Sequence, residues 1–206
     1  MRTLTSLLAL ALTLPSLASA STWNADQSHA SVTFEVKHLM ISSVHGSFDT
    51  VAATLKLDEK NLAKSTVEAT IGAASIDTGN EKRDGHLGGP DFFDVAKYPQ
   101  LTFKSTKVKK AGKNKLKVTG DLTIKDVTKP VTLDVVYTQA VKSPFAPVNL
   151  RGFTATTTID RTKWGLTWNK ALETGGVVVG TDIKIKLSVE FQEQAAPEEV
   201  KTASAK

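Results

Sequence analysis

The residues best suited to chemistry lie close together in one segment, at Arg83, Asp84 and His86. A carboxylate near an imidazole can act as a general acid and base. The chain, however, has no cysteine, no nucleophile elbow and no serine in a fixed pattern with histidine and aspartate. We therefore expect an Arg83–Asp84 ion pair that pins a loop to the sheet. Catalysis by Asp84 and His86 on a hydrophobic substrate is the alternative.

The four histidines do not indicate a metal site, because metal ligands must converge. His29 and His38 are nine residues apart in one strand pattern, so in a straight strand they lie far apart on opposite faces. His38 and His45 could approach each other across a turn, but they lack a third partner. No metal and no cofactor are expected.

The segment that begins at Asn80 is predicted to form two short helical turns. Asn80 starts the first turn, and glycines up to Gly89 end it without the spacing of a phosphate loop. Asp91 would cap the second turn, which presents the adjacent aromatics Phe92 and Phe93. Two adjacent side chains on a helix point in different directions, so at least one should reach inward. The inward aromatic side chain could simply plug the end of the barrel or could contact a ligand, and the sequence leaves both interpretations open.

Around this segment, apolar and polar residues alternate in eight runs, a pattern typical of half-buried antiparallel strands. A short run at 44–48 could continue into the second of them. No helical pattern of ordinary length separates the runs, so a sandwich or a barrel is expected. A closed barrel of eight strands has an interior that side chains fill or that holds one small ligand. The runs are 30–37, 51–57, 67–73, 101–105, 115–125, 131–137, 153–159 and 183–191.

The same alternation would fit an outer-membrane barrel with its apolar face toward lipid. Lysines on the polar faces and the presence of only two tyrosines, too few for aromatic girdles, argue against that arrangement. The lysines of residues 107–117 indicate a solvated hairpin. Docking of this hairpin on an anionic membrane surface is the less favoured interpretation.

The two ends of the chain differ in composition from the middle. Residues 1–20 have a positive start, an apolar stretch and small residues before the cleavage position, as in a secretory signal peptide. Residues 21–192 would form one barrel domain, and 193–206 a disordered polar tail. Export to the periplasm follows from the leader, and it makes nucleic acid an improbable partner despite a net charge of +5.

Several motifs in order resemble the YceI-like family of exported polyisoprenoid-binding proteins. The resemblance covers roughly residues 22–191. It is carried by Asp26-Gln-Ser-His29 with Phe34-Glu-Val36-Lys-His38, Val44-His-Gly46-Ser-Phe48, Ser75-Ile-Asp77-Thr-Gly79-Asn80, Arg83-Asp84-Gly-His86-Leu87, Asp91-Phe92-Phe93-Asp94, Tyr98-Pro99, Gly120-Asp-Leu-Thr-Ile124 and Ile159-Asp-Arg161-Thr-Lys-Trp164-Gly165.

This resemblance implies a lipocalin-like antiparallel barrel with a short helical lid between strands. It implies binding, without catalysis, of an isoprenoid lipid or isoprenoid quinone, with the chain in the pore and the head near the mouth. Arg83, Asp84 and His86 would contact the head. The expected ligand-binding residues are Phe34, Val36, Phe48, Arg83, Asp84, His86, Phe92, Phe93, Phe103, Leu122, Ile124, Phe153 and Trp164.

The sequence departs from the family pattern at Gly88-Gly89, which predicts a looser lid, and at Trp164 and Trp168, which leave the ligand's length open. A ligand-free stress or structural protein is a further alternative. Transient contact with a membrane surface is expected of a lipid carrier. The oligomeric state is open, and an edge-to-edge homodimer is one arrangement that the sequence allows.

Overall fold

The computed structural model describes residues 20–173 and 175–195. Residues 1–19 of the predicted leader and the end of the predicted polar tail lie outside these residues. Eight antiparallel strands form a barrel in the order β1-β3-β4-β6-β7-β8-β10-β11, and β11 pairs with β1 to close it. The barrel strands are β1 (Ser21–His38), β3 (Val51–Leu57), β4 (Thr66–Gly72), β6 (Gln100–Gly112), β7 (Lys115–Ile124), β8 (Val127–Tyr137), β10 (Asn149–Asp160) and β11 (Val179–Glu193).

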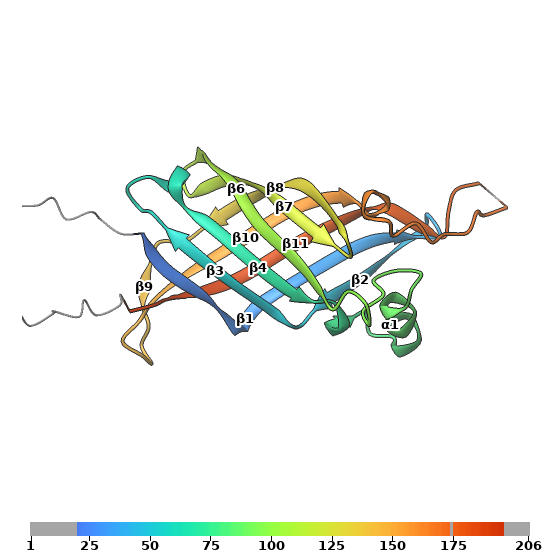
Figure 1. Cartoon of the computed structure of the whole chain (residues 1–206), viewed down its shortest axis with the longest axis horizontal. Helices are drawn as coiled ribbons and strands as arrows, with labels where there is room; N and C mark the ends of the chain where they lie inside the picture. The colour runs from blue at the N-terminus through green and yellow to red at the C-terminus, as the bar shows by residue number, and fades with distance from the viewer. Residues whose placement is uncertain (1–19, 174, 196–206) are drawn as a thin grey trace, which may run out of the picture.

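Shorter elements complete the fold, and one helix stands at one end of the barrel, away from the ends of the described chain (Figure 1). These elements are β2 (Ser42–Phe48), β5 (Ile76–Asp77), β9 (Val141–Lys142), α1 (Glu81–Gly88) and the 3₁₀ turns η1 (Leu62–Lys64), η2 (Ala73–Ser75) and η3 (Arg161–Trp164). The predicted eight-stranded barrel with one short helix is confirmed. No helix in the described ranges is long and apolar enough to cross a membrane.

The alternation of the sequence places apolar side chains inside the barrel. In β7, for example, Leu116 and Val118 are buried, whereas Lys115 and Lys117 are exposed. The charged faces of the strands point outward, and the lysine-rich hairpin of β6 and β7 lies at the end of the barrel away from α1 (Figure 1). The core therefore lies within the barrel.

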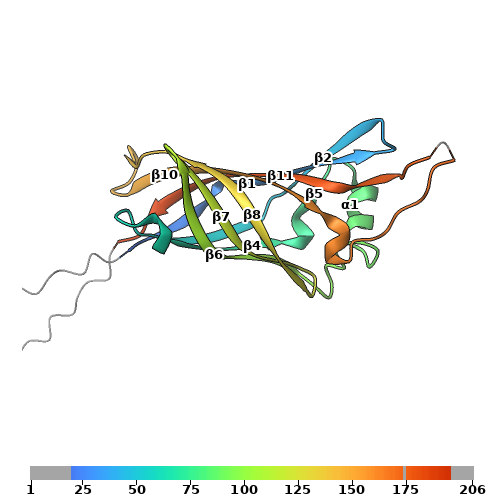
Figure 2. The same cartoon turned by 90° about the horizontal axis from the view of Figure 1, so that it is seen from above.

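The first strand is unusually long and irregular. Its first residues pair with β3, and the stretch after a bulge between Ala25 and Ala30 pairs with β2. The run at 44–48 is therefore a strand of its own, because the chain leaves the sheet at Asp49 and Thr50 before β3 begins. The β1–β2 hairpin extends beyond the barrel at the α1 end (Figure 2).

The seam between β8 and β10 is short. The two strands pair only from Phe153↔Tyr137 to Thr156↔Asp134. Beyond this stretch Trp164 of η3 is buried among Ile124, Val131 and Ile159, and its Nε1 donates to the Leu122 carbonyl at 3.0 Å. The indole thus packs where the ladder between these strands ends.

Candidate functional site

The barrel encloses an apolar cavity of about 260 Å³ that is lined by residues from all eight barrel strands. Leu57 and Leu116 line it toward the end that holds η1, and Leu87 and Phe92 line it at the α1 end. Among the residues that the structure describes, the polar members of the wall are Ser65, Thr66, Thr157 and Arg161. Such a space suits a hydrophobic ligand with few polar groups.

At one end, the cavity is bounded by the lid segment, which we define as residues 78–99. The predicted helical turn at Asn80 is confirmed, since the Asn80 side chain accepts from the backbone N–H of Arg83 and α1 ends at Gly88, with Gly89 as its C-cap. The predicted second helical turn is wrong. Residues 91–97 form successive hydrogen-bonded turns, because Asp94 adopts φ 49°, a left-handed conformation that a helix excludes.

These turns bring both phenylalanines to the cavity wall. The Phe92 ring lies 5.1 Å from the His86 ring and 5.5 Å from the ring of Trp168. Phe93 packs edge-on against Phe48 at 5.6 Å. The lid segment therefore contributes to the wall of the cavity through these turns as well as through Leu87 of α1.

Within the lid segment, Thr78 ties α1 to the chain that directly follows β5. Its backbone N–H and hydroxyl both donate to Asp84 Oδ1, at 3.0 and 2.5 Å. Arg83 donates from Nε to the Thr78 hydroxyl at 2.6 Å and from Nη2 to the Thr78 carbonyl at 2.8 Å. No Arg83–Asp84 ion pair forms in the described residues, contrary to expectation, because adjacent helical side chains do not face each other.

Arg161 organises the chain beside the lid segment. It is 4% exposed and lines the cavity. Nε donates to the Gly180 carbonyl at 2.9 Å, Nη1 donates to the Leu166 carbonyl, and Nη2 donates to the Trp168 and Val179 carbonyls at 3.1 and 3.2 Å. Burial lowers the pKa of the guanidinium. Its carbon Cζ lies 6.0 Å from the centre of the Phe92 ring.

The opposite end of the barrel is filled by Trp23, which is 1% exposed and packs with Leu57 and Phe191. The guanidinium of Arg151 lies 5.5 Å from the centre of the Trp23 ring, and its Nη2 pairs with Glu59 Oε1 at 2.6 Å. In the part of the chain that the structure describes, Arg151 Nε has no hydrogen-bond partner. Neither Trp23 nor Arg151 belongs to the cavity wall.

Nine of the thirteen residues predicted to bind ligand line the cavity, and four do not. Arg83, Asp84 and His86 lie on α1, where His86 pairs with Asp91 at 2.9 Å. Trp164 is buried outside the wall. The nine residues that line the cavity are Phe34, Val36, Phe48, Phe92, Phe93, Phe103, Leu122, Ile124 and Phe153.

Sequence reasoning missed Arg161 and the wall residues of β3, β4, β8 and β11. The signal for Arg161 was present, because Ala155, Thr157 and Ile159 point inward and Arg161 follows at the same spacing.

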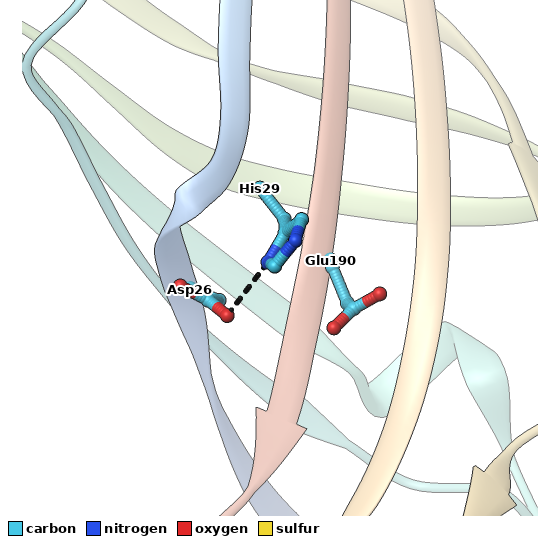
Figure 3. A group of neighbouring side chains, drawn as sticks. All are labelled: Asp26, His29 and Glu190. Atoms are coloured by element: carbon cyan, nitrogen blue, oxygen red, sulfur yellow. Dashed lines mark hydrogen bonds and ion pairs between the residues drawn. The ribbon is translucent and has the colours of Figure 1, made fainter. Parts of the chain in front are cut away.

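A second group of titratable side chains lies on the outer surface (Figure 3). Asp26 and His29 project from the bulge of β1, 2.9 Å apart, and Glu190 projects from β11. Hydrogen bonds from Ser28, and then from His29, lower the pKa of Asp26 to about 2. The Asp26 carboxylate in turn raises the pKa of His29. The group is an ion pair between the exposed His29 and the half-buried Asp26, with a neighbouring carboxylate, and it does not line the cavity.

Residues 23–191 match the family model of the YceI-like domain. The chain belongs to the YceI-like family. A UPF0312 protein of Staphylococcus aureus (strain USA300) is 41% identical over 166 residues, which cover 81% of this chain and 94% of that protein.

Solved structures of YceI-like and related proteins share the barrel. BcnA of Burkholderia cenocepacia has a TM-score of 0.71 at 28% identity, over 81% of this chain and 98% of BcnA. The YCEI protein of Campylobacter jejuni has a TM-score of 0.65 at 34% identity, over 77% and 90% of the two chains. A polyisoprenoid binding domain from Saccharophagus degradans, 12% identical, shares the fold with a TM-score of 0.60 over 85% and 99% of the two chains.

Proposed function

We propose that this YceI-like protein binds and carries a hydrophobic chain, an isoprenoid lipid or isoprenoid quinone, within the barrel. The apolar cavity wall, built by inward-facing residues of eight strands, is the observation that carries this proposal. Burial of an isoprenoid chain there gains about 0.8 kcal/mol per CH₂-sized group, and the chain has no polar groups to satisfy. That the fold also forms a domain described as polyisoprenoid-binding is consistent with this function.

Binding is favoured over catalysis because the candidate acid and base do not face the cavity. Asp84 is bonded to Thr78, and His86 is bonded to Asp91 on the outside of α1. We further propose that the protein works in the periplasm, for which the signal-peptide character of residues 1–20 is the support. No cofactor is needed for such a carrier, and the homodimer stays a prediction.

A carrier of this kind must take up its hydrophobic ligand from a membrane. Met40 and Ile41 lie at the tip of the β1–β2 hairpin beyond the α1 end, and Ile41 is 83% exposed. Leu39 N–H donates to the Val178 carbonyl at 2.8 Å, which fixes the base of the tip. We propose that this tip, rather than the lysine-rich hairpin at the other end, contacts the bilayer. Ile41→Glu should then abolish cosedimentation with lipid vesicles while leaving the barrel folded.

Native mass spectrometry of the protein, purified from its own cells by mild extraction, tests the proposed function. The expected spectrum contains a bound lipid. Protein that carries no lipid and takes up none would refute the carrier function and favour a ligand-free role.

A pair of adjacent variants gives a matched control. Ala155 is buried and lines the cavity, whereas Thr156 faces out and is exposed. Ala155→Trp should block uptake of a fluorescent isoprenoid without loss of the β-sheet circular dichroism signal, and Thr156→Trp should leave uptake intact. Equal uptake by both variants would place the ligand elsewhere.

A further inference from the structure

The group of Asp26, His29 and Glu190 lies on the outside of the barrel, where β1 and β11 pair to close it (Figure 3). Registered pairs of these two strands continue on both sides of residues 26–29, but on β11 Glu190 alone stands opposite those four residues. A bulge of this kind turns side chains away from the regular alternation of a strand. It places Asp26 and His29 beside Glu190.

The three side chains converge as the ligands of one metal ion do. One ligand atom from each lies within 4.8 Å of the other two, and His29 Nδ1 lies 2.9 Å from Asp26 Oδ2. Around a tetrahedral Zn²⁺ with bonds of about 2.1 Å, ligand atoms stand roughly 3.4 Å apart. Small side-chain rotations bridge this difference, since the His29 side chain is 63% exposed and free to turn.

Neighbours that are not themselves ligands orient the Asp26 carboxylate. Ser28 donates from its backbone N–H and from its hydroxyl to Asp26 Oδ1, at 3.0 and 2.6 Å. Gln192 of β11 donates from Nε2 to Asp26 Oδ2 at 3.0 Å. Hydrogen bonds of this outer-shell kind hold the ligands of metal sites in position. Asp26 is therefore the fixed member of the group.

Glu190 gives the group an excess of negative charge. In the part of the chain that the structure describes, its carboxylate takes part in no hydrogen bond or ion pair, although it lies beside His29 (Figure 3). The group thus holds two carboxylates for a single imidazole. A divalent cation at its centre would attract both carboxylates, whereas the pair of His29 and Asp26 leaves Glu190 unbalanced.

We propose that Asp26, His29 and Glu190 bind one divalent transition-metal ion of the Zn²⁺ class, with water at the remaining position. Imidazole nitrogen favours Zn²⁺ over Mg²⁺ and Ca²⁺, and carboxylate oxygen is also an ordinary ligand of Zn²⁺. From the sequence we expect no metal, because the histidines do not converge; here two carboxylates take the place of further histidines. The site lies apart from the cavity, so it does not depend on the proposed carrier function.

Isothermal titration calorimetry of the untagged protein with Zn²⁺ tests the site. One ion should bind per chain, and Mg²⁺, which prefers oxygen ligands and loses its water reluctantly, should bind at least about tenfold more weakly. His29→Ala and Glu190→Gln should each weaken Zn²⁺ binding about tenfold or more, since loss of even an outer-shell partner costs roughly 10- to 100-fold. His45→Ala, which removes an exposed histidine of β2 outside the group, should leave the affinity unchanged.

A wild-type protein that does not bind Zn²⁺ would overturn the inference. Equal affinity for Zn²⁺ and Mg²⁺ would also overturn it, because it would indicate only attraction to an acidic surface. Unchanged Zn²⁺ affinity in both His29→Ala and Glu190→Gln, or a loss in His45→Ala as large as in His29→Ala, would place the ion elsewhere.

A second measurement uses the wild-type protein alone, in case a variant does not fold. Amide chemical shifts are compared with and without Zn²⁺, and the changes should gather at residues 25–30 and 189–192. Zn²⁺ at 100 times its Kd should also shift the unfolding equilibrium about 100-fold toward the folded state, because the ion joins the first barrel strand to the last. Shift changes centred on His45 or His86, or an unfolding equilibrium that Zn²⁺ leaves unchanged, would overturn the assignment.

Discussion

Replacing Thr78 with valine tests whether a single hydroxyl holds α1 against the chain that directly follows β5. The hydroxyl donates to Asp84 and accepts from Arg83, at 2.5 and 2.6 Å. Valine preserves the branched shape, including the methyl that faces Gly46. The substitution therefore removes two hydrogen bonds and little packing.

The size of the effect follows from these bonds. A hydrogen bond to a charged group contributes about 1.5–3 kcal/mol, and exposed charges contribute less. Because Arg83 is exposed and Asp84 is half-buried, we expect the two bonds together to contribute about 2 kcal/mol. The bonds that use the Thr78 backbone remain. Opening of α1 should then become about 30-fold more frequent.

Hydrogen exchange followed by mass spectrometry measures this opening directly. Amides of α1 should exchange about 30-fold faster in Thr78→Val, in line with the free energy above, while amides of β7 and β8 keep their rates. Thr78→Ser, which keeps the hydroxyl, should exchange almost as slowly as the wild type. Unchanged exchange of α1 in Thr78→Val would show that this hydroxyl does not hold α1 in place.

Three further substitutions test the barrel itself. Gly120→Ala should destabilise by about 1–3 kcal/mol in urea, since an added Cβ would lie 2.5 Å from both Phe103 Cζ and the Lys104 carbonyl; unchanged stability would contradict this contact. Asp26→Asn should lose up to roughly 2 kcal/mol at pH 7. Because the pKa of Asp26 is lowered to about 2, the difference in unfolding free energy between Asp26→Asn and the wild type should shrink as pH falls from 4 through 2. A difference that stays constant with pH would show that the ionised Asp26 carboxylate does not stabilise the fold. Trp23→Ala should lose about 3–5 kcal/mol in thermal unfolding, and a much smaller loss would mean that the indole does not close the barrel.

The strands and the start of α1 could be read from the sequence because local rules determine them. A period of two marks each barrel strand, and Asn80 caps α1 with its own side chain. The turn at Asp94 could not be read, because a left-handed aspartate has no reliable local signal. The bulge of β1 does have a weak local signal, because the polar residues 26–29 interrupt the alternation of apolar and polar residues.

The candidate site was predictable where it is made of strand residues and not where it depends on distant chain. The inward direction of Phe34, Phe103 and Phe153 follows from the alternation of side chains along their strands alone. The inward direction of Arg161 continues the alternation of β10, but the carbonyls of Leu166 and Gly180 that bind its guanidinium come from later parts of the chain, which no local pattern places beside it. Arg83 was misassigned because its true partner, Thr78, precedes the helix and carries no charge.

The pairing of β1 with β11 also sets an order of events in biosynthesis. The ribosome makes Trp23 early and its registered partner Glu193 at the other end of the same domain. Until β11 has been synthesised, the inner faces of the first seven barrel strands have no closed interior to line. The nascent chain therefore keeps an apolar surface exposed for most of its synthesis, and long-range strand pairing of this kind is slow. A holding chaperone would find its binding surface on the same residues that later face the ligand.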